Sequence, residues 1–178
     1  YDKPLISPIS FELKKGEKIA IVGKNGVGKS TLVKTLLNII PFLGGSFKFN
    51  DNIKINYFSQ TELDDLSITP MEYIQNNEKN ITNLEARSIL ARSGIKKELA
   101  IRPLNELSGG EEAKTRLSLL TLKKSNILVL DEPTNHLDKI AKESLKKAID
   151  EYPGVVILVS HEKDFFEDLV DYKILIGD

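Results

Sequence analysis

The chain has 178 residues, no cysteine and a formal net charge of −1, from 25 Lys and Arg against 26 Asp and Glu side chains. This near-balance argues against a surface that binds nucleic acid or anionic membrane by charge alone. The lack of cysteine excludes disulfides and thiolate metal sites and fits the cytoplasm, and no apolar run approaches the roughly 20 residues of a membrane-spanning helix, so we expect no membrane partner.

Apolar and polar residues alternate over 5–18, on either side of a turn at 14–17. The alternation predicts two half-buried antiparallel strands. The same alternation returns over 47–58, after a turn at Gly44 and Gly45. We therefore expect a small antiparallel β layer beside the core of the protein.

Between these segments, an apolar run at 19–22 leads into the block Gly-Lys-Asn-Gly-Val-Gly-Lys-Ser-Thr and then into a helical pattern. This strand-to-helix context predicts a P-loop, and a glycine-rich turn that merely starts a helix is the alternative. We expect Gly23, Gly26 and Gly28 to take positive φ, so that the backbone of the turn, which also holds Asn25, approaches an anion closely.

The end of this block predicts a site for ATP and Mg²⁺. Lys29 would bind the β- and γ-phosphates, and the Ser30 hydroxyl would bind the Mg²⁺ that bridges them. Thr31 would reach the α-phosphate side.

Residues 70–124 have apolar positions at helical spacings and no strong strand pattern, which predicts an inserted helical subdomain. The short apolar runs at 126–131 and 154–160 predict buried strands of a parallel sheet, joined by an amphipathic helix over 140–152. The predicted fold class is therefore α/β: a P-loop NTPase core with a mostly parallel sheet, a flanking antiparallel β layer and an inserted helical subdomain. We expect one domain over 1–178, with its core at 1–69 and 125–178.

The run at 126–131 ends in the carboxylate Asp131, and a second carboxylate, Glu132, follows it directly. Ligands bind at the carboxyl edge of such a sheet, so we expect Asp131 to hold Mg²⁺ and Glu132 to act as general base toward the attacking water. The alternative is a pair of acidic residues in the first turn of the following element.

A second anion site is predicted at the start of a later helix. Ser108 and Glu111 have the spacing of a capping box, so a well-capped helix is one interpretation. That interpretation leaves Gly109 and Gly110 unexplained, because adjacent glycines in a first turn destabilise a helix. Their use would be close backbone approach to an anion.

Three blocks together resemble the ATP-binding cassette superfamily, over nearly the whole chain: the P-loop at 23–31, Leu-Ser-Gly-Gly-Glu at 107–111 and Ile-Leu-Val-Leu-Asp-Glu-Pro at 127–133. The resemblance implies that two such domains dimerise head to tail, with the P-loop of each facing Ser-Gly-Gly of the other. A single copy would bind ATP and hydrolyse it poorly.

The resemblance also implies roles for single residues. Gln60 resembles the glutamine that senses Mg²⁺ and the attacking water, and Asp138 resembles the carboxylate that couples the two sites. His161 resembles the switch histidine that contacts the γ-phosphate, with a surface histidine as the alternative, and Tyr1 stands where the family places the aromatic that stacks on adenine. Glu112 departs from the glutamine that the family usually carries there.

Within the superfamily, Glu-Pro-Thr-Asn-His-Leu-Asp at 132–138 and Ser-His-Glu-Lys-Asp-Phe-Phe at 160–166 resemble the soluble class F proteins, which carry two cassettes on one chain and act on the ribosome. The segment 60–107 lacks the arm insertion of many first cassettes, so we expect the second, C-terminal cassette. Because Met71 is the only methionine, we also expect a longer parent protein.

The function that this resemblance implies is an ATPase that produces ADP and phosphate and acts in translation, with a second cassette on the parent chain, the ribosome and tRNA as partners. Some class F members protect ribosomes against antibiotics. The alternatives are the nucleotide-binding subunit of a membrane transporter, which would dock a coupling helix beside Gln60, and a nucleotide-gated binding module.

Overall fold

The computed structural model describes residues 9–41, 44–58, 66–78, 80–119, 125–135 and 137–177. The chain divides into two compact units. Unit 1 spans Tyr1–Ser59, Ser125–Pro133 and Ile149–Asp178, and unit 2 spans Gln60–Lys124 and Thr134–Ala148.

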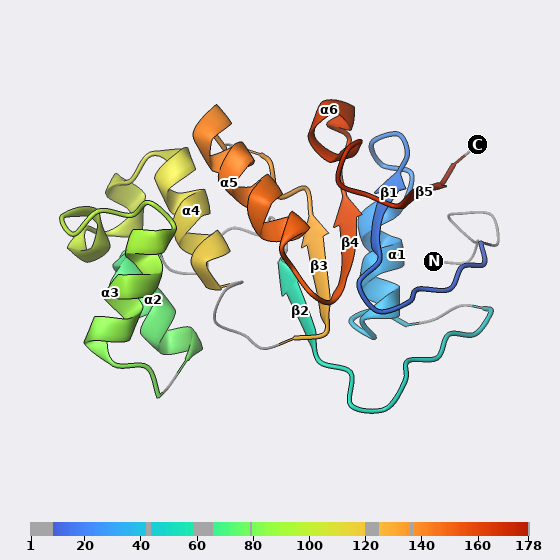
Figure 1. Ribbon diagram of the computed structural model, residues 1–178, viewed down its shortest axis with the longest axis horizontal. Helices are drawn as coiled ribbons and strands as arrows, with labels where there is room; N and C mark the ends of the chain where they lie inside the picture. Colours follow the sequence, from blue (N-terminus) through green and yellow to red (C-terminus); the bar gives the residue numbers. More distant parts are fainter. Residues whose placement is uncertain are drawn as a thin grey trace. The chain divides into compact units, whose positions relative to one another are not determined.

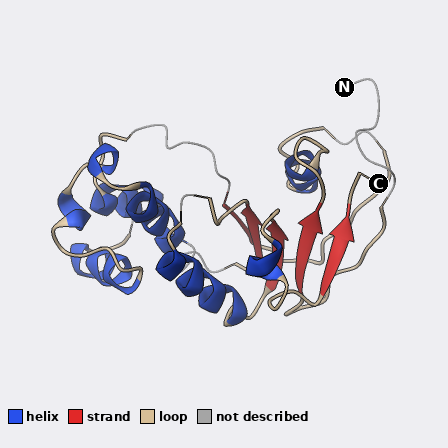
Figure 2. Ribbon diagram, turned by 90° about the horizontal axis from the view of Figure 1, so that it is seen from above, coloured by secondary structure: helices blue, strands red, loops and turns tan. Residues whose placement is uncertain are grey.

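The described part of unit 1 contains a five-stranded sheet in the order β2-β3-β4-β1-β5, with every neighbouring pair parallel (Figures 1 and 2). Its strands are β1 (Lys18–Val22), β2 (Ile55–Phe58), β3 (Ile127–Asp131), β4 (Val155–Val159) and β5 (Tyr172–Leu175). All residues of β3 and β4 are buried, as expected for the apolar central strands of a parallel sheet. The predicted α/β class and parallel sheet are confirmed.

Alternate residues of the strands form the core on one face of the sheet. Ile19 and Ile21 of β1 lie in one buried cluster with Val129 of β3 and with Val33 of α1 (Lys29–Leu36), the helix that follows the P-loop. Since these side chains are less than 3% exposed, they fix β1 and α1 against each other and so hold the turn between them in place.

The expected antiparallel layer is not found among the described residues. The segments 9–17 and 44–54 form no strand there, and β2 pairs parallel with β3. Ile9, Phe11 and Leu13 nevertheless pack, partly buried, against the core cluster. Their alternation therefore reflects burial of one side of an extended segment, which does not require a hydrogen-bonded partner strand.

The described part of unit 2 is helical. It contains α2 (Pro70–Asn77), α3 (Asn83–Arg92), α4 (Gly109–Ser118) and the short 3-10 turns η1 (Leu99–Ile101) and η2 (Leu104–Glu106). Ile74, Ala86 and Leu90 form its core and are fully buried. The helical pattern predicted from 70 onward is confirmed as far as 119, and residues 120–124 lie outside the described residues.

Two further helices complete the described chain. The helix α5 (Lys139–Asp150) begins in unit 2, and its last two residues belong to unit 1, which also contains α6 (Lys163–Phe166). No helix in the described ranges combines the length and the apolar character that crossing a membrane requires.

Candidate functional site

The P-loop joins β1 to α1 in unit 1 and leaves the first turn of α1 open. Gly28 is the N-cap residue, with φ 107°, and no side chain in the described ranges caps this helix. Its first turn carries no acidic residue. The N–H groups of such a turn are donors that an anion can satisfy, and the positive end of the helix dipole favours the anion.

The glycines of the loop serve two different purposes. Gly26 and Gly28 have φ 80° and 107°, which confirms the predicted positive φ. The same prediction was wrong for Gly23, which is not among the positive-φ residues. A Cβ on Gly23 would lie 2.5 Å from the carbonyl oxygen of Ile176, so this position needs glycine for space.

Lys29 is the buried cation of the loop. Its side chain is only 6% exposed, and its Nζ donates to the carbonyl oxygens of Gly23 at 2.9 Å and Lys24 at 3.2 Å. These bonds hold the ammonium inside the turn beside the N-terminus of α1. Of the other predicted loop residues, Asn25 is exposed and Thr31 is half-buried.

The carboxylate of Asp131 lies against this loop. The Ser30 hydroxyl donates to its Oδ1 at 3.1 Å, and the Tyr57 hydroxyl lies 3.3 Å from its Oδ2. Asp131 ends β3 and is 6% exposed, so its charge is held among donors and away from bulk water. Ser30 and Asp131, each predicted separately to hold Mg²⁺, are thus in direct contact.

This donor set fits Mg²⁺. The contact pairs a hydroxyl oxygen with a carboxylate oxygen, and Mg²⁺ prefers oxygen ligands, usually one or two from protein carboxylates with phosphates and water completing the shell. Across the described residues, no group of three or more His, Cys, Asp or Glu side chains is placed to bind a metal by itself. The protein therefore offers Mg²⁺ a partial shell that phosphate oxygens would complete.

Glu132 follows Asp131 with an unusual backbone. Its φ is 49°, in the left-handed region that is uncommon for residues other than Gly, Asn and Asp. Its N–H donates to the carbonyl oxygen of Val159 at 2.9 Å, and its Oε2 lies 2.8 Å from Nδ1 of His161. Since β3 and β4 are parallel neighbours, their carboxyl ends bring Glu132 and His161 together. The His161 side chain is half exposed, whereas that of Glu132 is 16% exposed.

The glycine pair of unit 2 lies at the tip of α4. The Ser108 side chain accepts from the Glu111 N–H, and the Glu111 carboxylate accepts from the Ser108 N–H at 2.9 Å, so the predicted capping box is confirmed. The Ser108 N–H and then its hydroxyl hold the pKa of Glu111 below its ordinary value. Ser108 and Gly109 are exposed and Gly110 is half-buried, which leaves the backbone of the tip accessible. A second anion site here remains a prediction.

Asp138 is tied to α4 within unit 2. Its Oδ1 accepts from the Ala141 N–H at 2.7 Å, and its Oδ2 lies 3.3 Å from Nζ of Lys114. The hydrogen bond from the Ala141 N–H is the main cause that lowers the pKa of Asp138, and Lys114 lowers it further. On the same helix, Glu112 pairs with Arg116 at 3.8 Å, so the extra charge at residue 112 has an intrahelical cation beside it.

Two predicted residues, Tyr1 and Gln60, lie outside the described residues. Conversely, the sequence analysis missed Tyr57 and Lys114, whose side chains contact Asp131 and Asp138. A signal for Tyr57 was available, because a tyrosine in an otherwise apolar strand needs a partner for its hydroxyl.

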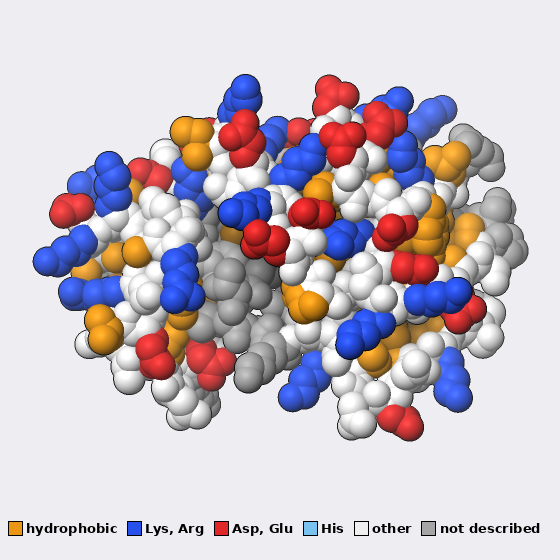
Figure 3. All heavy atoms as spheres, viewed as in Figure 1, with side chains coloured by type: hydrophobic (Ala, Val, Ile, Leu, Met, Phe, Trp, Pro, Cys, Tyr) orange, Lys and Arg blue, Asp and Glu red, His pale blue; other side chains and the backbone are white. Residues whose placement is uncertain are grey.

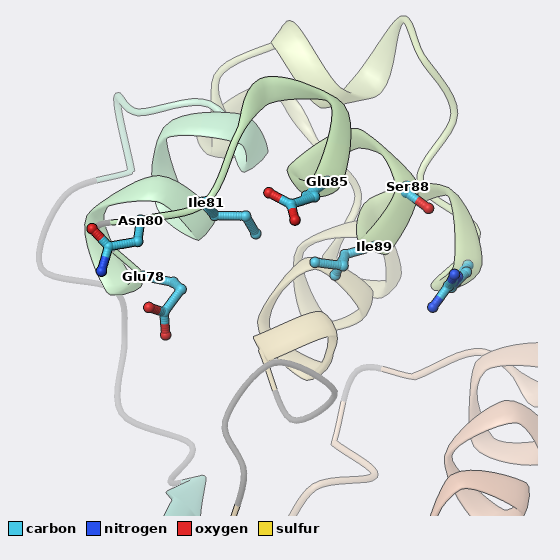
Figure 4. A pocket seen from close by; sticks show the side chains of 7 residues that line it. Glu78, Asn80, Ile81, Glu85, Ser88 and Ile89 are labelled. Atoms are coloured by element: carbon cyan, nitrogen blue, oxygen red, sulfur yellow. The ribbon is translucent and has the colours of Figure 1, made fainter.

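Unit 2 also contains a shallow recess of about 330 Å³ (Figure 4). Ile81 and Ile89 contribute apolar side chains to it, and Glu78, Glu85 and Arg92 contribute charged ones. None of the residues predicted from the sequence to bind nucleotide lies among its lining residues.

Comparison with known proteins identifies a family. The family model described as ABC transporter matches residues 6–135. The chain is 43% identical over 169 residues to the uncharacterized ABC transporter ATP-binding protein YfmM of Bacillus subtilis (strain 168), covering 95% of this chain and 33% of that protein. It is 39% identical over 163 residues to the human ATP-binding cassette sub-family F member 3, covering 90% of this chain and 23% of that protein. The chain thus spans a third or less of the length of these relatives.

Solved structures agree with the fold. A putative ABC transporter ATP-binding protein from Pyrococcus furiosus matches with a TM-score of 0.84 and 26% identity, covering 98% of this chain and 92% of that one. A chain in the crystal structure of the complex of the archaeal ribosomal stalk protein aP1 and the archaeal ribosome recycling factor aABCE1 matches with a TM-score of 0.75 and 28% identity, covering 93% of this chain and 32% of that one.

Proposed function

The chain belongs to the ABC transporter family, and on that premise we propose that it is the ATP-binding and ATP-hydrolysing cassette of a class F protein that acts on the ribosome. The observation that carries the ATPase proposal is the cluster at the carboxyl edge of the sheet in unit 1. There Ser30 contacts Asp131, and Glu132 contacts His161, although these pairs are 101 and 29 residues apart in sequence.

The loop residues bind the triphosphate. The uncapped N–H groups of α1 donate to phosphate oxygens, and the Lys29 ammonium moves from the carbonyl oxygens of Gly23 and Lys24 to the phosphates. The bound Mg²⁺ supplies charge neutralisation of the phosphates, and the residues that would hold it are Ser30 and Asp131. Gln60 is proposed as a further ligand, and Tyr1 as the aromatic that stacks on adenine.

Glu132 is proposed as the general base. Its carboxylate accepts the proton of the water that attacks the γ-phosphate, and His161, in contact with Glu132 Oε2, orients that carboxylate and reaches the γ-phosphate side. The left-handed backbone at Glu132, held by the bond from its N–H to Val159, fixes the direction from which the side chain leaves the strand end.

A second cassette completes the site in this proposal. Ser108, Gly109 and Gly110 are exposed or half-buried at the tip of α4, where they can contact the phosphates bound to a partner cassette. Asp138, whose carboxylate is held by Ala141 and Lys114, would couple the two sites. We propose that this partner is a first cassette on the same parent chain and that the present chain is the second.

Two resemblances support action on the ribosome. The relatives include a member of sub-family F, and a structural neighbour comes from a complex of a ribosome recycling factor with a ribosomal stalk protein. In this proposal the closed, ATP-bound pair of cassettes binds the ribosome near tRNA and hydrolysis releases it. Protection of the ribosome against antibiotics is one outcome that such binding can have.

Glu132→Gln in the parent protein tests this function, with Glu143→Gln on the exposed face of α5 as the matched control. We expect ATP turnover, measured as phosphate release, to fall by about 100-fold or more because the base is lost. We also expect the ATP-bound variant to sediment with ribosomes, while the control behaves as wild type.

Unchanged turnover in Glu132→Gln would remove Glu132 from the role of base. Lost turnover without ribosome association would contradict the class F assignment and would favour a cassette that serves another partner. Drug susceptibility of cells that express the parent protein would then test ribosome protection separately.

A further inference from the structure

The carboxylate of Asp131 is held on both oxygens by hydroxyl groups from different elements. Ser30 of α1 bonds to Oδ1 at 3.1 Å, and Tyr57 of β2 bonds to Oδ2 at 3.3 Å. Because Asp131 is 94% buried, each donor matters for keeping its charged form inside the protein.

The sheet explains why Tyr57 reaches Asp131. Tyr57 lies opposite Val129 in the parallel pair of β2 and β3, and Asp131 is two residues further along β3. Side chains at such positions lie on the same face of the sheet, and a diagonal neighbour two residues away is within reach of a long aromatic side chain. The register of β2 therefore sets which side chain meets the metal-binding carboxylate.

Packing alone does not account for a tyrosine at this position. The ring of Tyr57 packs, partly buried, against the core cluster of unit 1, and a phenylalanine ring would fill the same space. The hydroxyl adds a donor directed at a buried carboxylate. The residue type at 57 is thus matched to Asp131 and not only to the core.

We propose that Tyr57 is a positioning residue for the Mg²⁺ ligand Asp131. This inference rests on the proposed ATPase function. Ser30 is itself a proposed ligand, so its hydroxyl leaves Oδ1 when it turns to the metal, and Tyr57 then keeps the carboxylate oriented through Oδ2. Outer partners of this kind fix the orientation of a ligand and thereby raise metal affinity.

The test compares Tyr57→Phe with Tyr172→Phe in the 178-residue chain. Tyr172 is the control because it lies on β5, at the opposite edge of the same sheet from β2. Its hydroxyl donates to the Glu12 carbonyl oxygen at 2.8 Å, and the substitution removes this bond. ATP binding is titrated calorimetrically with Mg²⁺ and again in excess EDTA. Binding of Mn²⁺ to the protein with ATP is measured independently by electron paramagnetic resonance, and thermal unfolding is recorded for each variant.

Tyr57→Phe is expected to weaken the Mg²⁺-dependent part of ATP binding and the Mn²⁺ affinity by about tenfold. Its ATP affinity in EDTA should stay close to that of wild type, and Tyr172→Phe should match wild type in the three binding measurements. Each variant loses one hydrogen bond, so both should still unfold cooperatively, at temperatures only a few degrees below that of wild type.

Equal metal dependence in Tyr57→Phe and wild type would overturn the inference while leaving the proposed ATPase intact. Equal losses with Mg²⁺ and in EDTA, or loss of the folded state, would assign Tyr57 to packing alone and overturn it as well. Absence of ATP binding by the wild-type chain would contradict the proposed function itself.

Discussion

Gly177 shows how a single residue outside the P-loop can hold the loop in place. It follows β5 with φ 88°, and a Cβ built there would lie 1.9 Å from Cγ2 of Val27, inside the loop. The carbonyl oxygen of the neighbouring Ile176 likewise lies so close to Gly23 that a Cβ there would clash with it. The P-loop is therefore packed directly against the segment that leaves the edge strand β5.

We expect Gly177→Ala to destabilise the fold more than Gly16→Ala. Both residues have positive φ, which costs a residue with a Cβ about 1–2 kcal/mol. A Cβ on Gly16 would meet no atom within 4 Å, whereas the clash with Val27 adds about 1–3 kcal/mol of overpacking. Urea unfolding measures the difference. Equal free energies of unfolding for the two variants would show that the Val27 side chain moves out of the way of the new Cβ without destabilising the fold.

Some residues of the candidate site could be predicted from motifs in the sequence, whereas others were identified only from their contacts in the structure. Lys29, Ser30 and Asp131 could be predicted because their chemistry depends on a fixed local pattern after a strand. Tyr57 could not be connected to Asp131, because that contact depends on the register between two strands that are 74 residues apart. The spatial role of Gly23 was likewise hidden, since its neighbour Ile176 lies at the other end of the chain.

Among the elements, the helices differ in how their first N–H groups are satisfied. In unit 2, the helices α2, α3 and α4 each begin with a complete capping box, from Thr69, Thr82 and Ser108. In unit 1, the helix α1 begins with Gly28, and no described side chain caps it. In each capped helix the N-cap side chain accepts from the N–H three residues further on, whereas no described side chain occupies the first N–H groups of α1.

The capping box of α4 should make stability depend on pH. The folded protein holds the pKa of Glu111 below its ordinary value of 4.5, chiefly through the Ser108 N–H and then its hydroxyl, with Arg102 and Lys114 contributing. The ionised carboxylate therefore stabilises the fold fully above that value, and the contribution disappears as the pH falls through the lowered pKa.

Glu111→Gln removes the titrating charge and keeps a side chain that can complete the box. We expect the stability difference between wild type and this variant to shrink from about pH 6 to about pH 3, in a series of denaturant titrations. A difference that stays constant over this range would show that the Glu111 charge does not contribute.

Sequence patterns predicted the existence of the elements better than their pairing or their ends. The apolar runs predicted β3 and β4 correctly, because a short, continuously apolar segment is typical of a strand that is buried on both faces of a parallel sheet. Alternation at Ile9, Phe11 and Leu13 predicted a strand before the turn at 14–17, but the described residues 9–13 form no strand. The helix α1 ends at Leu36, and Asn38 takes φ 56° two residues later. Pairing depends on distant segments, and helix ends depend on single backbone angles.

On the scale of the whole molecule, the surface carries charge of both signs. Lys and Arg side chains are interspersed with Asp and Glu side chains on the face that Figure 3 shows, in keeping with a net charge of −1. Charge alone therefore gives this chain little attraction for a polyanion such as RNA. In the proposed function, contacts with the ribosome depend on shape and on other parts of the parent protein.

The isolated chain should hydrolyse ATP slowly, and its rate per molecule should rise with protein concentration as cassettes meet. Ser108→Asp keeps an N-cap side chain but adds a negative charge where a partner's phosphates would lie. We expect this variant to retain ATP binding and to lose the concentration-dependent turnover, measured as phosphate release. Fast turnover at concentrations where sedimentation shows only monomers would contradict the two-cassette site.

Calorimetric titration of Lys29→Ala with ATP and Mg²⁺ tests whether the buried cation of the P-loop binds a nucleoside triphosphate. Lys15→Ala, which removes an exposed lysine from the turn before β1, is the charge-matched control, and circular dichroism checks that both variants fold. We expect Lys29→Ala to weaken ATP binding by about 10- to 100-fold, because charge-assisted bonds to the phosphates are lost, while the control binds as wild type. Wild-type affinity in a folded Lys29→Ala protein would show that Lys29 does not bind the phosphates.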